Sequence, residues 1–179
     1  MTSNNIEVEV RSFLTDDQYD RLLGFFRTSS SDVVEDDQIT YYFEAPIDIR
    51  IQQNNSGSKI WMKKGKMHDN AREELEVNFG RDEFPMLEQM FAMMGYPVKV
   101  KWHRKRHKFR WKGFDVCIDD NKGYGKIIEI ERKTTAQGKD WALLEIRDAF
   151  NKIDILVTPK EEFDRKYMDY VQNWRELTR

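Results

Sequence analysis

Three pairs of glutamates, each separated by a single apolar residue, are the feature of this 179-residue sequence best suited to chemistry. The pairs are Glu7 with Glu9, Glu74 with Glu76, and Glu129 with Glu131. Because successive side chains of a strand point to opposite faces, both carboxylates of a pair share one face, about 7 Å apart. At an effective dielectric near 20, two such charges repel by about 2 kcal/mol, so three pairs on one side of a sheet require cations.

Basic residues recur with the same two-residue period and can supply those cations. Arg11 follows the first pair, Arg72 precedes the second, and the segment 99–112 contains eight Lys or Arg and no acid. Carboxylate ligands without histidine suit Mg²⁺ or Mn²⁺ better than Zn²⁺. Neighbouring Arg and Lys side chains suit phosphate oxygens. The pattern therefore predicts a site for a metal-bound polyphosphate.

Two simpler interpretations remain open from the residues alone. A single Glu-x-Glu strand is typical of a solvated outer face. The basic segment 99–112 also interleaves Trp102, Phe109 and Trp111, a pattern that fits an exposed surface for single-stranded nucleic acid. The alternation of three acidic pairs with basic residues in one short chain favours the enclosed site over both.

Composition limits the class of protein. Charged residues make up 35% of the chain and the mean hydropathy is −0.80, yet the net charge is only −2, so the protein as a whole is not a polyanion binder. Cys117 is the only cysteine, which excludes an intramolecular disulfide. No apolar run has the length of a membrane span, and the N-terminal residues do not resemble a signal peptide. We expect a cytoplasmic protein without a membrane partner, forming a single domain over 1–179.

Strands and helices can be placed coarsely from periodicity and turn residues. Strands are expected at 6–13, 38–44, 47–53, 59–64, 71–79, 98–111, 114–119 and 126–132. Segments 28–37 and 66–70 are expected to be loops. Helices are expected from the capping box at Thr15 to about residue 27, at 84–94, at 140–152, and after a second capping box at Thr158.

In this order, the motifs resemble those of the CYTH domain, the family of triphosphate tunnel metalloenzymes. The resemblance rests on Glu7-x-Glu9-x-Arg11, the aromatic strand TYYFEAP at 40–46, Lys64 before Gly65, Arg72-x-Glu74-x-Glu76, Arg104-x-Arg106, and the segment from Cys117 to Glu131 with Asp119, Glu129 and Glu131 at its acidic positions. One motif departs from the family pattern of two alternating arginines. Here Arg50 is flanked by Asp48 or Gln52 in place of a second arginine.

The resemblance implies an α+β fold: a closed antiparallel eight-stranded β-barrel forming a tunnel, with charged side chains inside and helices packed outside. It implies a divalent-metal-dependent triphosphatase that hydrolyses inorganic triphosphate, thiamine triphosphate or a nucleoside triphosphate. An adenylyl cyclase making cyclic AMP from ATP is the alternative within the family. A non-catalytic module binding polyphosphate or RNA is the alternative outside it.

The resemblance also assigns roles. The metal, Mg²⁺ or Mn²⁺, would be held by Glu7, Glu9, Asp119, Glu129 and Glu131. Phosphates would be bound by Arg11, Arg50, Lys64, Arg72, Arg104 and Arg106. The catalytic carboxylates would be Glu7, Glu9, Glu74 and Glu76, the last two positioning the attacking water through a second metal. The expected partner is a small-molecule triphosphate, with an RNA 5′-triphosphate as the alternative, bound by a monomer or homodimer.

Overall fold

The structure, a computed structural model, describes residues 6–64 and 71–179, without the side chains of residues 71 and 72. Its strands are β1 (Ile6–Leu14), β2 (Val33–Phe43), β3 (Asp48–Gln53), β4 (Ser58–Lys64), β5 (Ala71–Phe79), β6 (Val98–Trp111), β7 (Phe114–Asn121) and β8 (Gly125–Thr134). Its helices are α1 (Asp16–Ser29), the short 3₁₀ helix η1 (Arg81–Glu83), α2 (Phe84–Met93), α3 (Lys139–Lys152) and α4 (Lys160–Leu177). The predicted loop at 66–70 lies outside the described residues.

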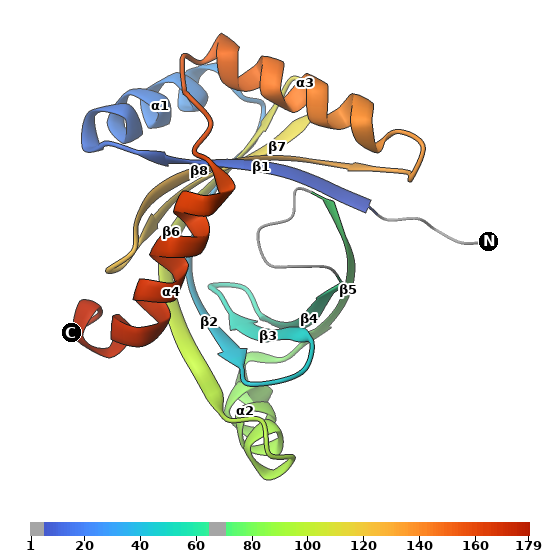
Figure 1. Cartoon of the computed structure of the whole chain (residues 1–179), viewed down its shortest axis with the longest axis vertical. Helices are drawn as coiled ribbons and strands as arrows, with labels where there is room; N and C mark the ends of the chain where they lie inside the picture. Colours follow the sequence, from blue (N-terminus) through green and yellow to red (C-terminus); the bar gives the residue numbers. More distant parts are fainter. Residues whose placement is uncertain (1–5, 65–70) are drawn as a thin grey trace.

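The eight strands form a closed antiparallel barrel in the order β1-β5-β4-β3-β2-β6-β7-β8 (Figure 1). Closure depends on β1, which pairs with β8 along its whole length and with β5 over its first three residues. The arrangement confirms the α+β barrel expected from the sequence. Each strand therefore has one face toward the lumen and one toward the outside.

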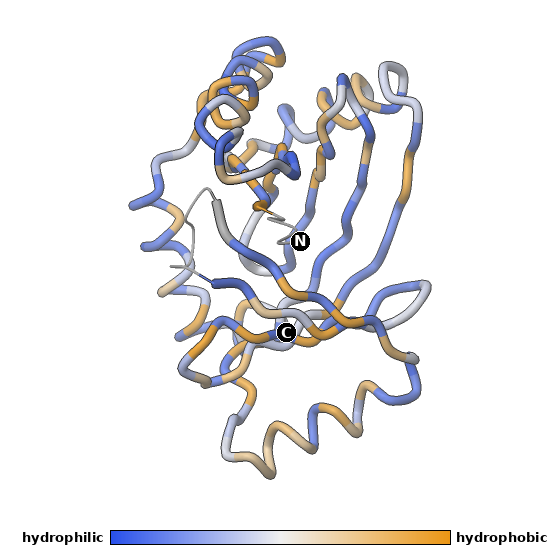
Figure 2. Tube along the Cα trace, turned by 90° about the vertical axis from the view of Figure 1, so that its right-hand side faces the viewer, coloured by the Kyte–Doolittle hydropathy of each residue, from blue (hydrophilic) through white to orange (hydrophobic). Residues whose placement is uncertain are grey.

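Strand β1 shows how the two faces differ. Val8 and Val10 are buried in the main hydrophobic core outside the barrel, whereas Glu7 and Glu9 line the interior. Strand β8, directly paired with β1, follows the same rule: Ile128 is in the core and Glu129 faces inward. Hydrophilic and hydrophobic residues alternate along the strands in Figure 2. The predicted orientation of the first glutamate pair is thereby confirmed.

The main core lies between the barrel wall and two helices. Helices α1 and α3 lie side by side over the outer face of the wall that contains β1, β7 and β8 (Figure 1). Phe26 of α1 and Ile146 and Phe150 of α3 are fully buried against it. The predicted capping box starts α1, because Thr15 Oγ1 accepts a hydrogen bond from the Gln18 N–H (3.2 Å). The apolar residues of this polar chain thus gather outside the barrel.

Two smaller cores attach the remaining helices. Phe84 and Phe91 of α2 pack on aromatic and aliphatic residues of β2 and β3. Tyr170 and Trp174 of α4 pack against Trp102 of β6, and the Tyr170 hydroxyl donates to the Lys101 carbonyl (3.1 Å). None of the helices in the described residues combines the length and apolar character that a membrane span requires.

Two local predictions are wrong, each because of a tertiary contact. Residues 33–37, predicted as loop, are the start of β2 because the long β6 extends beside them and pairs Val33 with Phe109. Thr158 does not cap α4. Its hydroxyl lies 3.0 Å from that of Ser12 and accepts the Phe13 N–H (3.0 Å), so this threonine ties the start of α4 to β1.

Replacing Phe26 by alanine tests the location of the core. Phe26 is fully buried, stacked on Phe109 (ring centroids 5.5 Å) and edge-on to Trp111 (5.4 Å). The cavity left by Phe26→Ala should reduce the free energy of unfolding by about 3–5 kcal/mol, measured by urea denaturation. Phe25→Ala, at a 40% exposed neighbour, is the control and should cost far less. Equal losses would contradict this placement of the core.

Candidate functional site

The barrel encloses a cavity of about 390 Å³ whose lining is mostly charged. All eight strands and α4 contribute side chains to it. Examples in strand order are Glu7, Tyr42, Arg50, Lys63, Glu74, Arg104, Asp119 and Glu129, with Phe163 and Tyr167 from α4. The acidic and basic side chains that the sequence distributes over the whole chain are therefore brought into one enclosed space.

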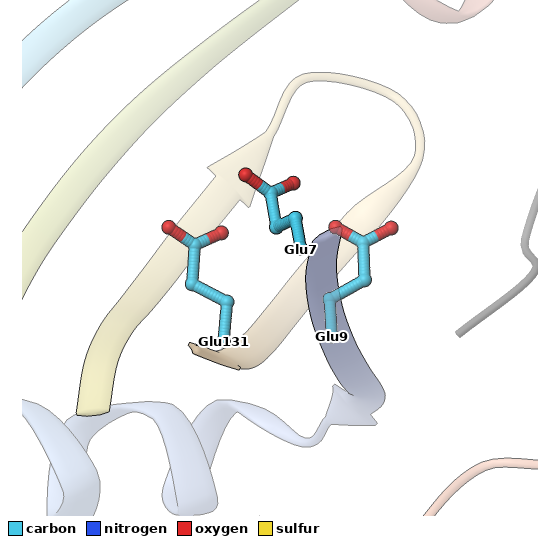
Figure 3. A group of neighbouring side chains, drawn as sticks. All are labelled: Glu7, Glu9 and Glu131. Carbon is cyan, nitrogen blue, oxygen red and sulfur yellow. The ribbon is translucent and has the colours of Figure 1, made fainter. Parts of the chain in front are cut away.

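Three carboxylates converge at one place on the lumen wall. Glu7 and Glu9 of β1 and Glu131 of β8 each offer an oxygen, and these oxygens lie within 4.8 Å of one another. The barrel register causes this, because Glu9 is paired directly opposite Glu131. Figure 3 shows the three side chains projecting to the same side of the two strands. Carboxylate oxygens without a thiol or imidazole fit Mg²⁺ or Mn²⁺.

Without a metal, the carboxylates of this cluster are buried close together and repel one another. Burial, together with the nearby charges of Glu129 and Glu7, raises the pKa of Glu131 to about 8. Burial also raises the pKa of Glu7, although Lys63 opposes the change. Metal-free protein therefore favours a protonated carboxyl in this cluster, and a bound cation would displace that proton.

Lys63 of β4 is the cation beside this cluster. Its ammonium nitrogen lies 2.7 Å from Glu7, 3.0 Å from Glu74 and 3.7 Å from Glu9. Burial by itself lowers the pKa of Lys63, but the three carboxylates raise it well above its ordinary value. The lysine is therefore always charged and joins β1, β4 and β5 across the lumen.

The sequence-based choice of Lys64 as the lumen lysine is wrong. The Lys64 side chain is 79% exposed and pairs with Glu73 on the outer face, 3.3 Å away. Lys63, one residue earlier, has the inward parity. Lys59 and Trp61 share the parity of Lys63 and also line the cavity, so the structure fixes the register that the sequence left open.

Arg104 and Arg106 face the lumen and are held by one acid. Asp119 accepts hydrogen bonds from Arg106 Nε and Nη2 (2.8 and 2.7 Å) and from Arg104 Nη1 (3.3 Å). Burial opposes ionisation of Asp119, but the two arginines dominate and lower its pKa. Glu129 lies 3.6 Å from Arg106. The structure thus places Asp119 and Glu129, both predicted metal ligands, beside arginines and not in the three-carboxylate cluster.

Arg50 is the buried arginine of the motif that differs from the family pattern of two alternating arginines. Its Nε donates to Asp48 (2.6 Å), its Nη1 donates to the Tyr42 hydroxyl (3.2 Å), and its guanidinium lies 4.3 Å from the Tyr42 ring centroid. Gln52, where the family pattern allows a second arginine, donates to the hydroxyl of Thr40 (3.0 Å). Strand β3 therefore presents one arginine whose charge is neutralised by Asp48 and one glutamine amide, whereas the family pattern would place two arginines here.

The remaining predicted residues also have defined places. Arg11 lines the cavity 3.8 Å from Glu9 and lies over the Phe163 ring, 5.3 Å from its centroid. Glu76 lines it and pairs with Lys59 (2.7 Å). The side chain of Arg72 lies outside the described part of the structure.

Aromatic residues at the α4 side of the cavity were not predicted as site residues. They are Tyr42, Trp102, Tyr124, Phe163 and Tyr167. Their spacing in the sequence is that of ordinary core residues, and only the packing of α4 beside β6 shows that they border the charged space. This region combines flat apolar surfaces with the Arg11 and Arg50 guanidiniums.

An antiparallel barrel with a charged interior and its main apolar core outside defines a tunnel-type domain. The chain belongs to the CYTH domain family, whose sequence model matches residues 5–167. No curated protein matches the chain.

Solved structures with the same fold cover most of the chain. A conserved hypothetical protein from Pyrococcus furiosus has a TM-score of 0.73 at 20% identity, covering 86% of this chain and 96% of that one. A protein from Bacillus halodurans, described as a candidate adenylate cyclase, has a TM-score of 0.64 at 15% identity over 87% and 94%. A protein from Hippeastrum has a TM-score of 0.59 at 16% identity over 90% and 95%. At these identities the likeness shows the fold.

The raised pKa of Glu131 predicts a pH-dependent stability of metal-free protein. The neutral form is favoured in the folded state, so its stabilising effect is complete below the unfolded-state pKa near 4.5 and is lost as pH rises through about 8. Glu131→Gln removes this loss, so the variant should gain melting temperature relative to the wild type between pH 5 and 9 in EDTA. Glu73→Gln, on the outer face, should show no such trend. Parallel pH profiles for wild type and Glu131→Gln would contradict the proton on Glu131.

Proposed function

We propose that the protein is a divalent-metal-dependent triphosphatase acting on a small-molecule triphosphate inside the barrel. The observation that carries the proposal is a three-carboxylate cluster, two of whose members (Glu7 and Glu9) line a 390 Å³ cavity that is also lined by several arginines and lysines. Such a site complements a polyphosphate that carries a divalent cation.

Glu7, Glu9 and Glu131 would hold Mg²⁺ or Mn²⁺. When bound there, the ion supplies positive charge that draws phosphate oxygens and offsets the charge developing on them. Glu129, which lies beside Arg106, keeps that arginine oriented in the lumen. The other metal candidate, Asp119, acts as an anchor for Arg104 and Arg106.

Arg11, Arg104, Arg106 and Lys63 are the proposed phosphate-binding residues. Arginine is suited to this role because its planar fork of N–H donors matches phosphate oxygens. Asp119 holds the guanidinium groups of Arg104 and Arg106 in position, so these side chains lose less conformational freedom when a phosphate binds. Arg50 is held by Asp48 and Tyr42 and orients the wall near α4.

Hydrolysis requires a water oxygen to bond to the terminal phosphorus while the bridging P–O bond breaks. The water proton passes to a carboxylate of the lumen, and orthophosphate and the shortened polyphosphate leave. Glu74 and Glu76 are the proposed carboxylates, because they line the cavity on β5, opposite the basic residues of β6 in the barrel order. Most of the rate enhancement in such reactions comes from positioning and charge neutralisation.

Structural relatives support the class of reaction. The Hippeastrum protein is described as a candidate adenylyl cyclase with a dominant triphosphatase activity, and the Bacillus halodurans protein as a candidate adenylate cyclase. Both descriptions concern attack on a triphosphate. Cyclisation of ATP is therefore the second candidate function, and the aromatic residues beside Arg50 give a base or other ring a surface to contact.

A product assay with purified protein tests the proposal. Inorganic triphosphate, thiamine triphosphate and ATP are each supplied with Mg²⁺ or Mn²⁺. Free orthophosphate is the expected product. Pyrophosphate together with cyclic AMP would show a cyclase, and tight binding without product would show a non-catalytic module.

The double substitution Glu7→Gln, Glu9→Gln should reduce turnover by more than about 100-fold, because it removes two of the three carboxylates that face the ion. Circular dichroism should show an intact fold, since neither side chain is part of the apolar core. Glu73→Gln is the control, a glutamate on the outer face that pairs only with exposed Lys64 among the described contacts. Undiminished turnover in the double variant would exclude the metal role.

Strand β6 allows a test of the tunnel against an exposed nucleic-acid surface. Arg104 and Arg106 face the lumen, whereas Lys105 between them is exposed. Alanine at either arginine should weaken triphosphate binding by about 10- to 100-fold, the value of a charge-assisted hydrogen bond, measured by calorimetry. Lys105→Ala should change it by less than about twofold. Equal losses at all three positions would favour the exposed surface.

A further inference from the structure

We propose that Lys63 is an internal counter-ion that takes the place of the divalent cation in metal-free protein and is released toward the substrate when the cation binds. The inference rests on the proposed function. It adds an order to that function: the ammonium group becomes available to phosphate only after the metal has bound.

The contacts of Lys63 motivate this assignment. Its ammonium group lies 2.7 Å from Glu7 and 3.7 Å from Glu9, and these are two of the three carboxylates whose oxygens converge for a metal. Its third partner, Glu74 at 3.0 Å, lies outside that cluster. Lys63 thus neutralises two of the carboxylates proposed to bind the metal, and it also has one partner, Glu74, that is not part of the metal cluster.

A divalent ion and the Lys63 ammonium group cannot both bind closely to Glu7 and Glu9. A divalent ion among Glu7, Glu9 and Glu131 would stand within a few ångströms of the ammonium group, in a buried space where like charges repel strongly. The Lys63 side chain is only 10% exposed, so water screens this repulsion poorly. Metal binding therefore weakens the contacts of Lys63 with Glu7 and Glu9, while Glu74 remains available on the neighbouring strand.

The released ammonium group has a place to go. Lys63 itself lines the cavity that Arg104 and Arg106 also line, and its four-carbon stem lets the charge move while the backbone stays paired with β3 and β5. A phosphate bound in the lumen would offer the ammonium group a new anionic partner. Metal and triphosphate should therefore each tighten the binding of the other, because both favour the released position of Lys63.

The chain contains a matched control in the next residue. Lys64 belongs to the same strand, carries the same charge and pairs with a glutamate of β5, but its side chain faces outward and is 79% exposed. A substitution at 64 changes the net charge of the protein as much as one at 63. Only the substitution at 63 removes the charge that competes with the metal.

The test is calorimetric titration of substrate-free protein with Mn²⁺. Lys63→Met should bind Mn²⁺ at least tenfold more tightly than the wild type, whereas Lys64→Met should stay within twofold. In addition, triphosphate should improve Mn²⁺ affinity less in Lys63→Met than in the wild type. A structural role for Lys63 as a simple strand link would instead leave Mn²⁺ affinity unchanged or weaken it in Lys63→Met, and that result would overturn the inference.

Two further measurements keep the test decisive. Lys63→Gln, which keeps a hydrogen-bond donor for Glu7, replaces the methionine variant if the latter does not fold, with the same expected gain in affinity. Lys63→Arg keeps the charge and should not gain affinity. Wild-type protein that binds no Mn²⁺ would overturn both the metal-dependent function and this inference. Wild-type binding without a gain in the uncharged variants would overturn the inference alone.

Discussion

The opposite orientation of consecutive strand residues is the constraint on which the structure depends. In a closed barrel that alternation separates the chain into an apolar outer surface, which α1 and α3 cover, and a charged inner one. Val8 and Glu9 are neighbours in sequence, yet one is in a hydrophobic core and the other in an aqueous lumen. A shift of register by one residue would exchange the two surfaces, so the apolar core and the site specify each other.

Charge balance inside the barrel follows from this constraint. Buried charges are stable only when paired, and among the described residues the lumen pairs Lys63 with Glu7, Arg50 with Asp48, and Arg106 with Asp119. For Glu131, burial and neighbouring carboxylates raise the pKa, which favours the neutral form of its carboxyl. Under the proposed function, a metal and a polyphosphate that enter the lumen would exchange partners with these pairs, and the binding of one would then affect the binding of the other.

The lumen has two regions of different chemical character. The acidic cluster and the two arginines on β6 form a charged region, whereas the region near α4 is built from aromatic residues around Arg50. Under the proposed function, the first region would bind metal and phosphate and the second would contact the group that the triphosphate carries. Gln52, at the position where the family pattern allows a second arginine, donates to Gln38, which also accepts a hydrogen bond from Arg104, and it is not part of the three-carboxylate cluster.

The sequence by itself indicated the fold class through the order of its motifs, which resembles that of the CYTH family. It also predicted the parity of the glutamate pairs and the inward position of Arg104 and Arg106, because period-2 alternation is a local property of a strand. Only the tertiary structure decided which charges meet. The β1–β8 register places Glu9 opposite Glu131, and the packing of β4 between β3 and β5 selects Lys63 in place of Lys64. Ion pairing falls off over a few ångströms, so partners far apart in sequence cannot be identified until closure of the barrel fixes the register of every strand.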